Sequence, residues 1–171
     1  SIRRQRQMCI RDRFVAVANG GTTSTSVMTS PDGITWNTRT TPNTGWLSIT
    51  WSPSLSLFVA VGGTGVGNRV MTSSNGTTWN SQASAADVNW TSVCWSSDLS
   101  LFVAVASNGT VSTNVMTSPN GTTWTSRTSP SINQWRSVCW ASGLSLFVAV
   151  SQNGSANRVM TSPNGTAWTA R

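Results

Sequence analysis

The sequence predicts an all-β protein, a β-propeller built from four repeats of about 44 residues with four strands each. Three observations lead to this prediction: an internal repeat, strand and turn chemistry within each repeat, and the lack of helical periodicity in any segment. Phenylalanines, methionines and tryptophans recur at spacings of 43 to 45 residues. These landmarks are Phe14, Phe58, Phe102 and Phe147; Met28, Met71, Met116 and Met160; and Trp36, Trp79, Trp124 and Trp168.

The repeats divide the chain into an atypical N-terminal segment and four blades. We place the propeller over residues 14–171, with blades at about 14–45, 46–89, 90–134 and 135–171. A chain of 171 residues is long enough for one domain with a sizeable core. Residues 1–13, SIRRQRQMCIRDR, lack the Ser, Thr and Gly of the repeats and resemble a translated sequencing-adapter artefact. The alternatives are a native basic arm and a degenerate first strand of the first blade.

The third repeat illustrates the expected strands. They cover Trp90–Trp95, Leu101–Val105, Asn114–Ser118 and Thr122–Arg127, separated by turn residues. The second strand, Leu-Phe-Val-Ala-Val, is apolar without alternation, so both of its faces should be buried. One four-stranded sheet cannot cover both of its own faces, whereas radially stacked sheets can, and this is the arrangement of a β-propeller.

The turn between the third and fourth strands carries Asx-Gly in every repeat. Asn-Gly is typical of a tight primed turn with positive φ angles, and the short Asx side chain can accept hydrogen bonds from turn amides. We expect a structural role for the Asx, Gly and Trp of each hairpin: Asp32, Gly33 and Trp36; Asn75, Gly76 and Trp79; Asn120, Gly121 and Trp124; and Asn164, Gly165 and Trp168. Calcium binding is the weaker alternative, because three of the four Asx residues are neutral amides.

These hairpins resemble the Asp-box, or bacterial neuraminidase repeat, which marks the same hairpin in propeller blades. The resemblance implies a sialidase-like propeller in which the hairpins are structural, and it says almost nothing about function. Two features depart from the family pattern. The spacing from Asx to Gly is one residue shorter, and Asn replaces Asp in three copies.

The composition excludes several kinds of active site. The chain has no His, Lys, Glu or Tyr, and its acids are Asp12, Asp32, Asp87 and Asp98. A Ser-His-Asp triad, a P-loop lysine and a histidine-bound metal are therefore absent. The Tyr and Glu that the sialidase resemblance would imply are missing too. We expect a chain that is not an enzyme and has no cofactor or metal.

The net charge of +7 does not indicate a nucleic-acid partner, since +4 of it lies in residues 1–13 and the other arginines are scattered. No apolar run reaches 18 residues, so no membrane span is expected. Cys94 and Cys139 occupy equivalent positions of neighbouring repeats, and Cys9 lies in the N-terminal segment. Small core side chains explain the equivalent pair better than a disulfide does.

Carbohydrate binding is the most concrete candidate activity. Trp46, Trp90 and Trp135 begin the first strand of their blades directly after polar loops, where partial exposure would let them act as aromatic platforms. Nearby donors and acceptors are Asn43, Asn89, Asn133 and Gln134. The alternative is that these tryptophans pack between blades. Tryptophans five residues later, Trp51, Trp95 and Trp140, are expected in the core.

The sequence thus favours a recognition or scaffold module at a cell surface or outside the cell, with multivalent glycan binding as its most specific form. Six N-x-Ser/Thr sequons agree with such a location, but turn chemistry alone explains most of them. A purely structural block of an appendage, fibre or viral surface protein is the alternative, and a fragment of a sialidase-like glycoside hydrolase is a third possibility. Because four blades with a damaged first strand close poorly, we expect the chain to belong to a longer propeller or to self-associate.

Overall fold

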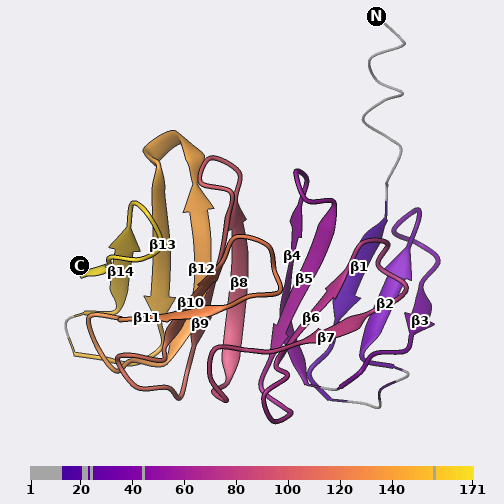
Figure 1. Ribbon diagram of the computed structural model, residues 1–171, viewed down its shortest axis with the longest axis horizontal. Helices are drawn as coiled ribbons and strands as arrows, with labels where there is room; N and C mark the ends of the chain where they lie inside the picture. The colour runs from indigo at the N-terminus through magenta and orange to yellow at the C-terminus, as the bar shows by residue number, and fades with distance from the viewer. Residues whose placement is uncertain (1–12, 21–22, 24, 44, 156) are drawn as a thin grey trace, which may run out of the picture.

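The computed structural model describes residues 13–20, 23, 25–43, 45–155 and 157–171, and in this part the chain is built of antiparallel strands (Figure 1). The first sheet holds β1 (Phe14–Val17), β2 (Val27–Ser30) and β3 (Asn37–Arg39). The second holds β4 (Trp46–Ser52), β5 (Leu57–Gly62), β6 (Val70–Ser73) and β7 (Asn80–Gln82). The third holds β8 (Trp90–Ser96), β9 (Leu101–Ala106), β10 (Val115–Ser118) and β11 (Thr125–Arg127). The fourth holds β12 (Trp135–Ala141), β13 (Leu146–Ser151), β14 (Val159–Ser162) and β15 (Thr169–Ala170), with a 3-10 turn at Ser142–Leu144.

Each sheet is a meander whose strands pair in chain order. The all-β prediction is confirmed, and no helix in the described residues has the length and apolarity needed to cross a membrane. The first sheet shows three strands, because the position expected for its leading strand falls on residues 1–12, outside the described part.

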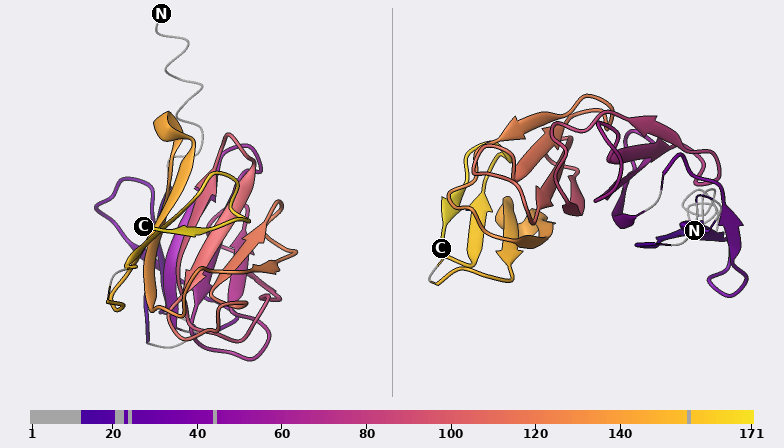
Figure 2. Two further views of the ribbon diagram at one scale, coloured as in Figure 1. Left: turned by 90° about the vertical axis from the view of Figure 1, so that its left-hand side faces the viewer. Right: turned by 90° about the horizontal axis from the view of Figure 1, so that it is seen from below.

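The four sheets stack face to face as blades around a common centre, which confirms the β-propeller prediction (Figure 2). The first strand of each complete blade lies innermost, and β8 packs between β4 and β12. Seen from below, the blades follow an open arc, with the first and fourth blades at its opposite ends.

The core lies between blades, as the apolar second strands predict. Every residue of β9 after Leu101 is buried. One of its faces, with Phe102 and Ala104, packs on Val59 and Val61 of the preceding blade. The opposite face, with Val103, packs on the following blade. We call these the leading face, directed toward the preceding blade, and the trailing face, directed toward the following one.

Hydrogen bonds also connect neighbouring inner strands. The Ser48 hydroxyl accepts the backbone N–H of Val93 at 3.2 Å, and the Ser92 hydroxyl accepts that of Val138 at 3.1 Å. The register of each inner hairpin shifts between its opening tryptophan and this serine position. The irregularity recurs in all three complete blades, so it belongs to the repeat itself.

Candidate functional site

The four Asx-Gly hairpins share one hydrogen-bond pattern. In the third blade the Ser118 hydroxyl accepts the N–H of Gly121 at 2.8 Å. The Asn120 side-chain oxygen accepts the N–H groups of the residues two and three positions later, at 3.0 and 2.9 Å. The Trp124 indole N–H donates to the Gly121 carbonyl at 3.0 Å. The same contacts recur around Asp32, Asn75 and Asn164.

This geometry corrects two expectations. The turn is not a tight primed turn, because Gly121 has a φ of +76° while Asn120 keeps a negative φ. The fourth strand begins at Thr125 and not at Thr122, since the N–H groups of Thr122 and Thr123 donate to the Asn120 side chain and cannot join the ladder. The side chain, and not a two-residue turn, therefore shapes the hairpin.

Asp32 is the one charged member of the hairpin series. Backbone N–H groups of Thr35 and Ile34 and the Ser30 hydroxyl donate to its carboxylate. These hydrogen bonds lower the pKa of Asp32 from 3.8 to about 2, because they favour the ionised form.

The opening tryptophans of the first strands are not exposed platforms but pack between blades, which is the alternative that the sequence left open. Trp46, Trp90 and Trp135 expose 1%, 0% and 0% of their surface. Trp90 lies among the side chains packed between the second and third blades, and Trp135 lies between the third and fourth. The three indoles lie in the interfaces between blades. Those of Trp46 and Trp90 donate their N–H to the carbonyls of Asn43 and Ala86 in the preceding links, at 2.8 and 3.0 Å. A glycan cannot reach these three rings.

The tryptophans expected in the core are half-buried instead. Trp51, Trp95 and Trp140 lie on the inner strands, and their rings contact Phe58, Phe102 and Phe147 at centroid distances of 4.4, 4.4 and 4.5 Å. Each ring has one face on a phenylalanine near the end of its strand, which leaves part of the indole accessible. The Trp140 indole N–H donates to Asp98 of the preceding blade at 3.0 Å.

The candidate amides lie on one rim of the arc, where the links between blades meet the loops between second and third strands. We call this the link rim; it is the lower side in Figure 1. Asn43 donates to the Thr64 carbonyl at 2.9 Å. Asn89 and Asn133 reach the hydroxyls of Ser107 and Ser151 at 3.2 and 3.3 Å. The three amides therefore tie each link to its neighbouring loop.

Gln134 belongs to an exposed polar chain on the link rim of the fourth blade. Its side-chain oxygen accepts from Gln152 at 3.0 Å, and the Gln152 oxygen accepts Nε of Arg136 at 2.7 Å. Arg158, also exposed, stands on the far side of β13 and donates Nε to the Gly154 carbonyl. The described residues contain one ion pair, Arg69–Asp87 at 3.6 Å, so these two guanidinium groups face no carboxylate there.

Sequence reasoning missed Arg136 and Gln152. A signal was present, because both positions vary among the complete blades: Leu47 and Thr91 stand at the position of Arg136, and Gly63 and Ser107 at that of Gln152. A position that differs in every blade is not fixed by the architecture and is a candidate for function.

The described carboxylates do not gather into a catalytic or metal site. Asp32 serves its own hairpin, Asp98 accepts the Trp140 indole, and Asp87 accepts the N–H of Gly67 at 2.6 Å beside Arg69. Among the residues that the structure describes, no three His, Cys, Asp or Glu side chains are placed to hold a metal ion. Asp12 lies outside the described residues.

The two described cysteines differ in their surroundings. Cys94 packs against the apolar side chains between the third and fourth blades, and Cys139 is exposed on the trailing face of the fourth blade. Burial, with a smaller effect of Cys139, raises the pKa of Cys94 to about 12. Both thiols are free, and Cys9 lies outside the described residues.

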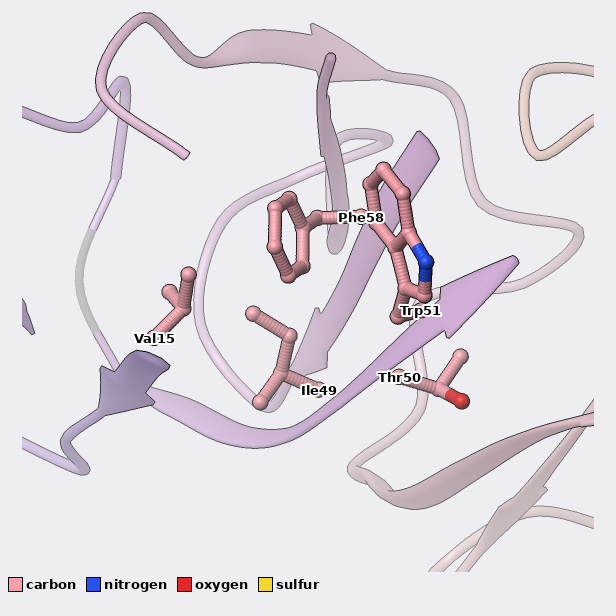
Figure 3. A pocket seen from close by; sticks show the side chains of 5 residues that line it. All are labelled: Val15, Ile49, Thr50, Trp51 and Phe58. Carbon is pink, nitrogen blue, oxygen red and sulfur yellow. The ribbon is translucent and has the colours of Figure 1, made fainter. Parts of the chain in front are cut away.

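A small pocket lies where β1 meets the second blade (Figure 3). Its volume is about 190 Å³, and it is lined by Val15, Ile49, Thr50, Trp51 and Phe58. Ligand pockets usually measure about 300–1,000 Å³, so this one is too small for most metabolites. It holds no acid or base, and we regard it as a packing gap between the first two blades.

Comparison with known proteins identifies the fold. No family model and no curated protein matches the chain. Among solved structures, one from a nidogen/laminin complex has a TM-score of 0.64 at 12% identity, over 95% of this chain and 61% of the other. A GH74 enzyme of Niastella koreensis has a TM-score of 0.59 at 16% identity, over 92% and 23%. A gluconolactonase of Xanthomonas campestris has a TM-score of 0.55 at 11% identity, over 78% and 44%.

These comparisons correct the expectation that the chain is not an enzyme, because two of the similar structures are enzymes. The propeller fold is compatible with catalysis. The composition of the chain rules out particular kinds of active site, but it does not justify the conclusion that the chain is not an enzyme. At identities of 11–16% the likeness shows the fold alone, and it assigns no reaction to this chain. The chain spans 23–61% of the structures it matches, and what it shares with them is a run of β-propeller blades.

Proposed function

We propose that the chain is a recognition scaffold that binds anionic glycans through the link rim of its fourth blade. The observation that carries this proposal is the hydrogen-bonded chain of Gln134, Gln152 and Arg136. With Nε of Arg136 held by Gln152, the outer nitrogens of the guanidinium are left to form paired hydrogen bonds with a carboxylate or sulfate. The neighbouring amides suit sugar hydroxyls, which both donate and accept.

The rigid setting of this rim supports the proposal. Binding residues are often carried on loops that a rigid scaffold positions. Here the amide ties of Asn89 and Asn133 fix the links beside the exposed chain. Arg158 adds a second positive charge on the other side of β13.

Two further assignments belong to this proposal. We assign the four hairpins to the Asp-box type, supported by their shared hydrogen bonds and despite the shorter Asx-to-Gly spacing. We also assign the protein to a cell surface or extracellular setting, where glycans are available; the sequons and the absence of lysine support this location.

A panel of immobilised acidic and neutral glycans tests the function. We expect the full chain to bind acidic glycans, and binding to weaken as salt is raised. Arg136→Gln should reduce affinity at least about tenfold, since a charge-assisted pair is lost. Arg127→Gln is the matched control. It removes the same charge from an outer strand, where Gln82 of the second blade already makes the equivalent bond to a threonine hydroxyl.

Two results would overturn the proposal. One is silence across the acidic glycans, which would favour a purely structural repeat block. The other is equal binding by the parent chain and Arg136→Gln, which would place any glycan site elsewhere.

A further inference from the structure

The first blade presents a leading face that is covered in every other blade. Met71, Met116 and Met160 are fully buried on this face, whereas Met28 exposes 39% of its surface. Phe102 and Phe147 are likewise buried, and Phe14 is 55% exposed. The difference arises because the leading faces of later blades pack on the blade before them.

The fourth blade presents the opposite, trailing face. Val61 and Val105 are fully buried against the next blade, whereas the equivalent Val150 is 41% exposed. Val148 is partly exposed where Val59 and Val103 are buried. The exposed residues have the same identities as those that fill the interfaces between blades, since Leu-Phe-Val-Ala-Val recurs in blades two to four.

The two open faces are therefore the two halves of one interface that the chain already forms internally. In the interfaces between blades, Val61 and Met116 lie in one apolar cluster, and Val105 and Met160 lie in another. Val150 and Met28 are the corresponding residues at the two ends of the arc. We propose that the trailing face of one chain packs on the leading face of a second copy, so that Val150 meets Met28 between chains.

The shape of the arc and the number of blades favour a closed pair. Within one chain the two faces lie at opposite ends of the arc and cannot meet (Figure 2). A head-to-tail contact between different faces produces a ring when its rotation closes. Two chains supply eight blades and three supply twelve, and propeller rings typically contain about four to eight blades. The ring expected is a dimer in which both interfaces are identical.

Light scattering coupled to size-exclusion chromatography tests this at micromolar concentration. The parent chain should have about twice the 18.2 kDa mass of one chain. Met28→Arg and Val150→Arg should each give monomers, because a guanidinium would be buried without a partner. Val66→Arg is the control, as Val66 is 88% exposed on a loop away from both faces and its replacement should leave the dimer intact.

A mixing experiment tests the pairing of the two faces. Met28→Asp and Val150→Arg should each be monomeric alone. Mixed in equal amounts, they should form a heterodimer with one unaltered interface and one Asp–Arg interface. Circular dichroism of each variant before mixing establishes that it is folded.

Three outcomes would overturn the inference. A monomeric parent chain would mean that a different partner, or further blades of a longer chain, covers these faces. An assembly that both single variants retain would place the contact elsewhere. Open-ended polymers would exclude a closed ring.

Discussion

At the scale of single residues, the acceptor in the Asx-Gly hairpin differs between the first blade and the other three. Asp32 is charged, and hydrogen bonds from Thr35, Ile34 and Ser30 lower its pKa from 3.8 to about 2. A lowered pKa in the folded state contributes stability above the unfolded value, near 3.8, and that contribution is lost as the pH falls through about 2. The three Asn hairpins have no such dependence.

Asp32→Asn should therefore have nearly the parental melting temperature at pH 7 and should melt above the parent between pH 4 and pH 2. Thermal unfolding of the parent and the variant at several pH values measures this difference. The effects of the other carboxylates cancel, because both chains contain them and are compared at the same pH. Asn120→Asp is the reciprocal control and should introduce acid sensitivity into the third blade. A difference that does not change with pH would mean that folding does not lower the pKa of Asp32, so that its hairpin hydrogen bonds do not favour the ionised form.

Residue-level prediction from sequence succeeded for spacing and failed for exposure. The repeat placed Trp46, Trp90 and Trp135 at equivalent positions, but a strand-start tryptophan beside a polar loop can face either solvent or a neighbouring blade. The packing of one blade on the next decides whether the indole faces solvent or protein. This packing depends on contacts between distant parts of the chain, which the local sequence around the tryptophan does not reveal. The sequence singled out Gln134 as a candidate, but not Gln152, which bonds to it, or Arg136, which bonds to Gln152.

At the scale of elements, the hairpin glycines are contacts between blades as well as turn residues. A Cβ at Gly121 would lie 2.9 Å from Leu57 Cδ2 and 3.0 Å from Val59 Cγ2 of the preceding blade. Gly33 has almost the same φ, +77° against +76°, but its nearest neighbours belong to Phe14 of its own blade, at 3.6 Å. Substitutions at Gly33 and Gly121 should therefore carry the same backbone strain, and only the one at Gly121 should also crowd the neighbouring blade.

Gly33→Ala should lower the free energy of unfolding by about 1–2 kcal/mol, because a residue with a Cβ is strained at positive φ. Gly121→Ala should cost a further ~1–3 kcal/mol, because it also overpacks the interface between blades. Chemical unfolding of both variants in the Val150→Arg background, where the ends stay open, measures the difference. Equal costs would show that the interface yields without strain and that the glycine is required only by the turn.

Most elements were predictable because each repeat carries its own periodicity and turn residues. The departures come from side chains that compete with the backbone ladder. Because backbone N–H groups donate to the Asn120 side chain, the fourth strand of the third blade begins later than predicted. A second departure lies in the turns after the first strands, where Ser56, Ser100 and Ser145 have φ values of 49°, 47° and 47°. Serine is uncommon at positive φ, so a serine at these positions does not predict this backbone conformation.

At the scale of the whole molecule, the arc is a one-dimensional array in which each blade packs on its neighbours. The second and third blades have a neighbour on both faces, whereas the first and fourth have one. In such an array stability is the sum of blade and interface contributions, so the terminal blades should open more easily than the central ones. The sequence predicted the blades, but the openness of the arc depends on the rotation between them.

Hydrogen exchange measured by mass spectrometry on the Met28→Arg chain tests this gradient in a monomer. Amides of β5 and β9 should exchange at least about tenfold more slowly than those of β1 and β13, because two interfaces must open to expose the former. In the parent chain at micromolar concentration, ring closure should supply the missing interfaces and raise the protection of β1 and β13 toward that of β5 and β9. Uniform protection in the monomeric chain would contradict the gradient, since it would mean that all four blades open as one cooperative unit.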